Sequence, residues 1–317
     1  MKAQKYSKTQ NMLLGIAIGD AFGAGYEFAY KDIMLFEKNF DLSCYKENPN
    51  RKLSHYKPGM YTDDTQMSIA IAELLASDEE FNHKNLADYF VNCYKRDPIL
   101  GYAKGFQAFL DSISSGKELL EKINPHSERN GAAMRSVPLG LVKDLDHLTK
   151  CAIINAEITH NTPKGIASSL AVALLSHAHF YNSSKVDLES LLSRIKSIDL
   201  ETSDHLSKIA AMKKFDPQLM CGEEYKNMGI PISGMRTAGA AFYLLSKYPK
   251  PKDVLKGAIL LGGDTDSVAA ISLGISMINN PMSKLPSFLF EQLTNHKYGK
   301  DYILDFGKRL HEKYFMP

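Results

Sequence analysis

Apolar segments with helical spacing constrain the fold of this chain more than any other feature. They are rich in Ala and Leu and lack the strict alternation of a half-buried strand. The clearest are residues 69–75, 167–180, 237–246, 254–261 and 268–278. Residues 152–154 could form strand or helix, but no hairpin turn joins them to a neighbouring segment. The sequence therefore predicts an all-α fold.

The breaks between these segments are short, which favours one compact domain. Pro58-Gly59 is typical of such a break, and Pro163 after Thr162 is suited to the first turn of a helix. The most polar region, residues 182–229, is interpreted as a variable helical insertion or cap. We expect a single domain over residues 1–317.

Charge and composition argue against nucleic-acid and membrane partners. The chain has 38 basic and 36 acidic residues, a formal net charge of +2, and no basic run. No stretch approaches the ~20 apolar residues of a membrane span. Four cysteines, Cys44, Cys93, Cys151 and Cys221, form no C-x-x-C pair and are typical of reduced thiols. These features predict a cytoplasmic protein.

The first of two acidic motifs stands at the start of an apolar segment. Thr62 precedes Asp63 and Asp64, and apolar residues follow within a few positions. Taken alone, the motif is typical of a helix start. Thr62 would cap the helix, and the two carboxylates would face the positive end of its dipole.

The second acidic motif lies near the other end of the chain. Gly262-Gly263 ends one apolar segment, and Asp264, Asp266 and Ser267 open the next. Taken alone, it too is an ordinary helix end followed by an acidic helix start.

Together, the two motifs indicate a metal site. Helices this apolar should be buried, and four carboxylates gathered at their starts would be costly without compensating positive charge. Glu27 adds a fifth carboxylate, so two Mg²⁺ or Mn²⁺ ions, which suit oxygen ligands, would nearly neutralise the set. The predicted ligands are Thr62, Asp63, Asp64, Asp264, Asp266 and Ser267. Two-metal phosphohydrolases use similar carboxylates, but no histidine or lysine adjoins either motif here.

Beyond the two acidic motifs, the chain contains a series of short motifs that together span about residues 11–280. They are residues 14–24 with Glu27-Phe28, residues 61–67, residues 130–135, Thr159-His160 and residues 261–267. In this order they resemble the ADP-ribosylglycohydrolases, the family that includes the dinitrogenase reductase-activating glycohydrolase. The resemblance implies a compact orthogonal bundle of many helices around a central cleft that holds a dinuclear Mg²⁺ or Mn²⁺ centre.

The resemblance also implies roles for single residues. The two acidic motifs match the metal-ligand positions, and Glu27 matches an acidic residue at the metals that takes part in catalysis. A further set matches positions along the ADP-ribose cleft. These residues are Asn130, Gly131, Ala132, Met134 and His160. The backbone N–H groups of the Asn130-Gly131 loop could hold a diphosphate.

Four residues keep two interpretations each. Arg129 stands where many family members carry glycine, and it is either a surface arginine or a phosphate partner. His160 lies near the nucleotide or bonds to the backbone at a helix start. Arg135 contacts a phosphate or pairs with a buried aspartate. Asp97, before Pro98, is a second candidate for proton transfer or an ordinary turn residue.

The resemblance implies hydrolysis of the glycosidic bond at the anomeric carbon of an ADP-ribosyl group. Glu27 and Asp97 are the candidate catalytic residues. The expected partners are ADP-ribose and an ADP-ribosylated protein, with arginine the first acceptor to consider. Alternatives are a serine, nucleotide or small-molecule linkage, reversal of an ADP-ribosylating toxin, or a non-catalytic ADP-ribose-binding relative.

Overall fold

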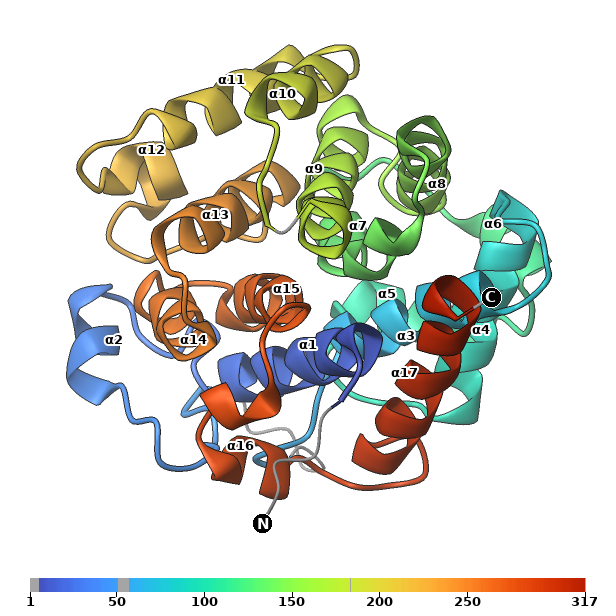
Figure 1. The fold of residues 1–317 in the computed structure, drawn as a ribbon, viewed down its shortest axis with the longest axis horizontal. Coiled ribbons are helices and arrows are strands. Elements are labelled where there is room, and N and C mark those ends of the chain that lie inside the picture. Colours follow the sequence, from blue (N-terminus) through green and yellow to red (C-terminus); the bar gives the residue numbers. More distant parts are fainter. Residues whose placement is uncertain (1–5, 51–56, 183, 317) are drawn as a thin grey trace.

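Helices make up the regular structure throughout the part of the chain that is described. The computed structural model describes residues 6–50, 57–182 and 184–316. Within these ranges it contains seventeen α-helices and three short 3₁₀ helices, and the only β-type pairing is an isolated bridge between Ile230 and Gly263. The predicted all-α fold is confirmed (Figure 1).

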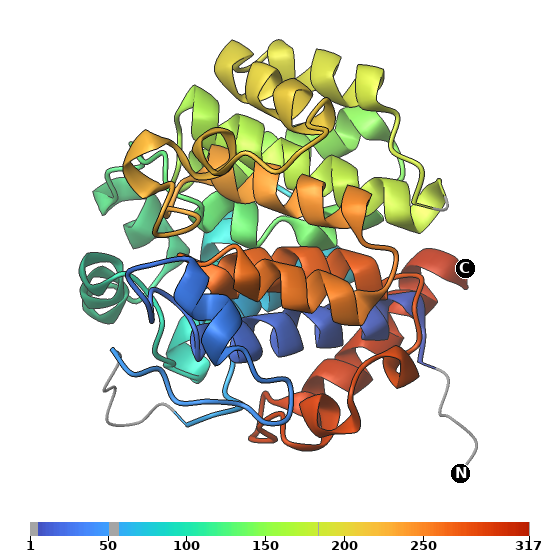
Figure 2. The same ribbon diagram turned by 90° about the vertical axis from the view of Figure 1, so that its left-hand side faces the viewer.

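Two buried helices from opposite ends of the chain form the centre of the molecule. They are α1 (Lys8–Ala24) and α15 (Thr265–Met277), which lie side by side (Figures 1 and 2). Every residue of α15 is buried, and so is nearly all of α1. A helix that is apolar all round has no face suited to water, so both helices require a core position.

Glycines let α1 and α15 approach each other closely. Gly15, Gly19 and Gly23 recur every four residues and so share one face of α1. A Cβ atom on Gly19 would overlap the carbonyl group of Ala269, and one on Gly23 would lie 2.5 Å from the Cα atom of Asp266. The contact is therefore backbone against backbone and admits no side chain at these positions.

Five helices pack around this pair. They are α3 (Asp63–Ala76), α9 (Pro163–Tyr181), α13 (Gly234–Lys247), α14 (Pro251–Leu260) and α17 (Lys300–Phe315). Thr162 caps α9 by accepting a hydrogen bond from the N–H of Gly165 at 3.1 Å, and Pro163 takes the first helical position as predicted.

Further helices complete the wall around this centre. They are α2 (Met34–Asn39), α4 (His83–Arg96), α5 (Lys104–Ser112), α6 (Gly116–Lys122), α7 (Gly131–Met134), α8 (Leu145–Glu157), α16 (Ser287–Glu291) and the 3₁₀ turns Val137–Leu141, Glu223–Tyr225 and Met282–Lys284. Residues 152–154, ambiguous in sequence, belong to α8. No helix in the described ranges combines the length and the apolar character that crossing a membrane requires.

The polar region 182–229 folds into a layer at one edge of the molecule. It contains α10 (Leu188–Lys196), α11 (Leu200–Ala210) and α12 (Pro217–Cys221), which lie beyond α9 and α13 (Figure 1). Asp187 and Asp199 cap α10 and α11 by accepting hydrogen bonds from backbone N–H groups.

Because α1 and α15 are in close contact, we predict that one methyl group added between them strongly lowers the stability of the fold. Gly19→Ala should destabilise the fold by about 1–3 kcal/mol, the usual result of overpacking a filled core. Gly105→Ala is the matched control, since a Cβ there meets nothing within 4 Å and should leave stability unchanged or slightly raised. Urea denaturation of both variants measures the difference. Equal stability of the two would contradict the backbone contact.

Candidate metal centre and substrate cavity

A cavity of about 820 Å³ opens where α1 ends and α3 and α15 begin. Its wall combines carboxylates with aromatic, basic and amide side chains. Residues from both acidic motifs and from the loop 122–131 line it together. The two acidic motifs, which are far apart in the sequence, therefore lie together at this cavity, as expected.

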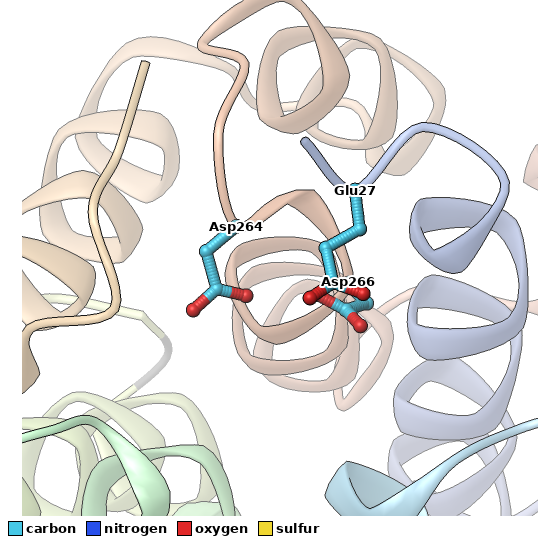
Figure 3. A group of neighbouring side chains, drawn as sticks. All are labelled: Glu27, Asp264 and Asp266. Atoms are coloured by element: carbon cyan, nitrogen blue, oxygen red, sulfur yellow. The ribbon is translucent and has the colours of Figure 1, made fainter. Parts of the chain in front are cut away.

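Three buried carboxylates gather at the inner end of this cavity. Glu27 follows α1, while Asp264 and Asp266 lie on either side of the first residue of α15 (Figure 3). Oxygen atoms of the three side chains lie within 4.8 Å of one another. Each residue is less than a tenth exposed, so the group could hold a metal ion in a site largely shielded from water.

Asp63 and Asp64, in the first turn of α3, line the same cavity. The Oδ1 atom of Asp64 is buried and makes no hydrogen bond within the described residues. Burial and repulsion by Asp266 raise the pKa of Asp64 well above its ordinary value, and they act on Asp264 in the same way. A cluster of carboxylates that ionises with difficulty in the absence of a positive charge has the properties of a site for a hard cation such as Mg²⁺.

The two hydroxyl residues of the motifs differ in position. Ser267 lines the cavity with the carboxylates, whereas Thr62 does not. The Thr62 hydroxyl donates its proton to the Oδ1 atom of Asp20 at 2.7 Å. A donating hydroxyl keeps lone pairs that can bind a cation.

Asp20 is a buried carboxylate close enough to Asp64 and Asp266 to interact with them, and it belongs to neither acidic motif. Its carboxylate accepts four hydrogen bonds, from the backbone N–H and the hydroxyl of both Thr62 and Thr65, at 2.6–3.0 Å. It therefore caps α3 from the neighbouring helix α1, and Thr62 makes no capping bond with its own side chain. Burial raises the pKa of Asp20 to about 6, and the repulsion of Asp266 adds to the rise against these hydrogen bonds. Its signal in the sequence was a charge inside an apolar run.

Asn130 and Gly131 have structural partners as well as cavity surface. The side-chain nitrogen of Asn130 donates to the Oδ2 atom of Asp264 at 2.6 Å and to the hydroxyl of Thr237 at 3.2 Å. A Cβ on Gly131 would lie 2.7 Å from the ring of His160. Asn130 thus orients one carboxylate of the cluster, and Gly131 leaves space for the histidine.

The structure separates the other two loop residues. Met134 lines the cavity, but Ala132 is fully buried and is not part of the cavity wall. The carbonyl oxygen of Ala132 accepts hydrogen bonds from Ser136 at 2.6 Å and Asn155 at 3.0 Å. Its position does not support the expected substrate contact, because its side chain packs in the core.

Asp97 lies outside the cavity wall, just after α4. Its carboxylate is 3.7 Å from His296, and its carbonyl oxygen accepts a 2.6 Å hydrogen bond from Gln66. This geometry favours the turn interpretation over a role in proton transfer.

Arg135 and His160 both line the cavity. Of the two interpretations of Arg135, pairing with a buried aspartate is not found among the described residues. Its guanidinium donates to Asn155 and Thr159, and it lies 4.4 Å from the ring of Phe90. Burial lowers the pKa of Arg135 to about 9. The ring of His160 lies 2.7 Å from the hydroxyl of Thr159 rather than bonding to the backbone.

The outer part of the cavity carries aromatic and basic side chains. The rings of Phe106 and Phe109 are stacked with centroids 6.2 Å apart. Lys104, Lys122 and Arg129 bring positive charge to the same wall. Nothing in the local sequence of residues 104–109 distinguishes these aromatics from core residues, so only the fold identifies them.

Fold and site together define a helical enzyme with an acidic cluster beside a large cavity of mixed polar and apolar lining. The chain belongs to the ADP-ribosylglycohydrolase family, whose model matches residues 1–316. It is therefore a glycohydrolase.

Relatives of known type match most of the chain. An ADP-ribosylhydrolase ARH3 of Xenopus tropicalis is 27% identical over 99% of this chain and 97% of its own length. The human ADP-ribosylhydrolase ARH3 is 24% identical over 90% and 88%. The ADP-ribosyl-[dinitrogen reductase] glycohydrolase of Rhodospirillum rubrum is 29% identical over 54% of this chain and 58% of its own. A solved structure titled "ADP-ribosylglycohydrolase-related protein complex" shares the fold, with a TM-score of 0.68 and 21% identity over 96% of this chain and 97% of that one.

The acidic cluster predicts a stabilising effect of divalent cations that depends on pH. Mg²⁺ at 100 times its Kd should stabilise the folded protein by about 2.7 kcal/mol. The pKa values of Asp64 and Asp264 are raised, so protons compete with the cation, and the Mg²⁺ effect should shrink as pH falls from 8 to 5.5. Thermal unfolding with and without Mg²⁺ measures this. Asp64→Asn should abolish the effect, and the exposed control Asp78→Asn should retain it.

Asp20 predicts a contrast between two aspartates that cap helices. Asp20→Asn removes an acceptor from buried donors and should cost about 1–3 kcal/mol of stability. Asp199 also accepts from a backbone N–H and a hydroxyl, both of Thr202, but Asp199 itself is partly exposed to water. Asp199→Asn should change stability little, because asparagine caps helices as well as aspartate does. Denaturant titration compares the two, and equal losses would contradict the role of Asp20.

Proposed function

We propose that this glycohydrolase uses two Mg²⁺ or Mn²⁺ ions to release ADP-ribose from a modified protein side chain. One observation carries the proposal: Glu27, Asp264 and Asp266 place oxygens within 4.8 Å of one another at a cavity of about 820 Å³. That volume is in the range of sites that enclose a small-molecule ligand.

The acidic motifs supply the proposed ligands. These are Thr62, Asp63, Asp64, Asp264, Asp266 and Ser267, with Glu27 beside them. When bound, the ions would supply Lewis acidity toward the ribose hydroxyls and a water of lowered pKa.

Glu27 is the proposed proton-transfer residue, and the fold holds it firmly. Asn48 donates a 2.8 Å hydrogen bond to its carbonyl oxygen, and the N–H of Phe28 donates to the carbonyl of Gly263 at 2.8 Å. Phe28 has a φ of +46°, an uncommon conformation for a bulky residue. The turn after α1 is thereby tied to the start of α15, which directs the Glu27 carboxylate to the cluster.

The rest of the cavity suits a nucleotide. Phe106 and Phe109 offer an aromatic surface for a purine, and base–aromatic stacking contributes about 1–3 kcal/mol. Arg129 and His160 lie on the same wall and suit a diphosphate. The N–H groups of the Asn130–Gly131 turn are further donors for this group.

The acceptor side chain is the finer part of the proposal. Arginine is the first candidate because the motif order resembles the dinitrogenase reductase-activating enzyme. A different linkage, such as serine, is the second candidate. The whole-chain likeness is to proteins named ADP-ribosylhydrolase ARH3, while the likeness to the dinitrogen reductase enzyme covers 54% of this chain.

We further propose that residues 1–317 act as one domain in the cytoplasm, without nucleic-acid or membrane partners. The layer 182–229 would be a variable cap. None of its described residues lines the cavity, so an effect on substrate choice would come from contact with the protein carrying the ADP-ribosyl group.

The direct test is release of ADP-ribose from arginine-modified and serine-modified proteins in the presence of Mg²⁺. We expect release from one of them and its loss on chelation. The double variant Asp64→Asn with Asp266→Asn should be inactive, and the exposed control Asp78→Asn should be active. A folded, Mg²⁺-loaded protein that releases no ADP-ribose from either substrate would contradict the proposal.

Glu27 predicts a separate kinetic effect. Glu27→Gln keeps the shape of the side chain and should lower kcat by about 10²- to 10⁴-fold through loss of proton transfer. The exposed Glu37→Gln serves as control. Single-turnover rates at saturating Mg²⁺ measure the loss, and an unchanged rate would assign proton transfer to another group.

A further inference from the structure

A chain of hydrogen bonds connects a fully buried arginine to the histidine of the cavity wall. The Nη2 atom of Arg135 donates to the Oγ1 atom of Thr159 at 2.7 Å. The same oxygen lies 2.7 Å from the Nδ1 atom of His160. All three residues line the cavity, and the Nε2 atom of His160 makes no hydrogen bond within the described residues.

The available protons fix the direction of these bonds. A guanidinium can only donate, so Thr159 accepts from Arg135. Among the described residues, His160 Nδ1 is the only hydrogen-bond partner left for the hydroxyl proton of Thr159. When this proton is used in the bond, Nδ1 accepts it, and the ring proton of neutral His160 is on Nε2.

The surroundings keep this histidine neutral. The charged groups that act on the ring are Arg135 and Arg129, and both are positive. Burial and these two charges lower the pKa of His160 to about 3. The Nε2 atom makes no hydrogen bond within the described chain, and the ring lies against Gly131, where a Cβ would come 3.0 Å from Nε2.

Arg135 adds a positive charge without an anionic partner in the described chain. Its hydrogen bonds go to neutral groups of Asn155 and Thr159, and its flat face lies over Phe90. A buried charge of this kind is costly alone and is stabilised by a nearby anion. An anionic ligand in the cavity would meet this need.

We propose that Arg135 and Thr159 are positioning residues that hold His160 as the Nε2–H tautomer, a fixed donor to an anionic ligand oxygen. The identity of that ligand, the diphosphate of ADP-ribose, rests on the proposed function. The tautomer itself does not depend on it.

The tautomer is measured directly on the wild-type protein by ¹⁵N NMR of the histidine rings. The signals of His160 are assigned by their loss in His160→Gln. We expect Nε2 in the protonated range and Nδ1 in the unprotonated range from pH 6 to pH 8. A protonated Nδ1, or a ring that becomes charged in this interval, would overturn the proposal.

Variants then connect the tautomer to binding. Thr159→Val removes the hydroxyl, so we expect a mixture of tautomers and a loss of ADP-ribose affinity of about 10-fold, as for a hydrogen bond to a charged group. Thr159→Ser should keep both properties. Thr149→Val is the matched control, since Thr149 lies in α8, the helix that ends just before Thr159, and also accepts from an arginine, Arg194, but has no hydrogen bond to a histidine among the described residues.

The outcomes separate this inference from the proposed function. Loss of affinity in Thr159→Val with an unchanged tautomer would assign Thr159 a merely structural role and overturn the proposal. An unchanged affinity in a folded Thr159→Val would do the same. The expected wild-type tautomer without any ADP-ribose binding would support the hydrogen-bond chain and contradict the proposed function.

Discussion

The glycine face of α1 is the constraint on which this structure depends. Because Gly15, Gly19 and Gly23 carry no side chain, α1 can lie with its backbone against α15. This contact brings the end of α1 to the start of α15, so that Glu27 and Asp266 meet although they are far apart in the chain. A larger side chain on this face would separate the two helices and, with them, the carboxylates.

The close packing of α1 and α15 brings carboxylates of like charge together, and their repulsion costs free energy. Hydrogen bonds within the fold offset part of this cost. Asp20 is stabilised by four hydrogen bonds from the start of α3, and Asp264 accepts one from Asn130. These bonds fix the positions of the carboxylates, but they add no positive charge. The raised pKa values of Asp64 and Asp264 express the remaining repulsion. A divalent cation bound there would remove this repulsion, because its charge would favour the ionised form of every ligand.

Much of this arrangement follows from the sequence, for physical reasons. Apolar helices must be buried, so acidic residues at their starts had to face the interior, and the fold class and the meeting of the two motifs were predictable. Contacts set by tertiary packing were not. Asp20 is a single charge inside an apolar run, which does not reveal that it accepts hydrogen bonds from α3, and Phe106 is indistinguishable from a core residue without the fold. Asp97 and Ala132 lie outside the cavity wall, so their positions do not support the roles expected from the sequence. This could not be foreseen, because local sequence does not reveal which face of a turn or a short helix meets the cavity.

The central claim is that this carboxylate cluster binds divalent cations, and Mn²⁺ binding followed by electron paramagnetic resonance tests it most directly. Free Mn²⁺ gives a signal that is lost on binding, so a titration counts the ions held by each chain. The account predicts two tightly bound ions per chain and their loss in Asp266→Asn. A folded wild-type protein that leaves all the Mn²⁺ free, or a variant that binds as well as the wild type, would contradict it.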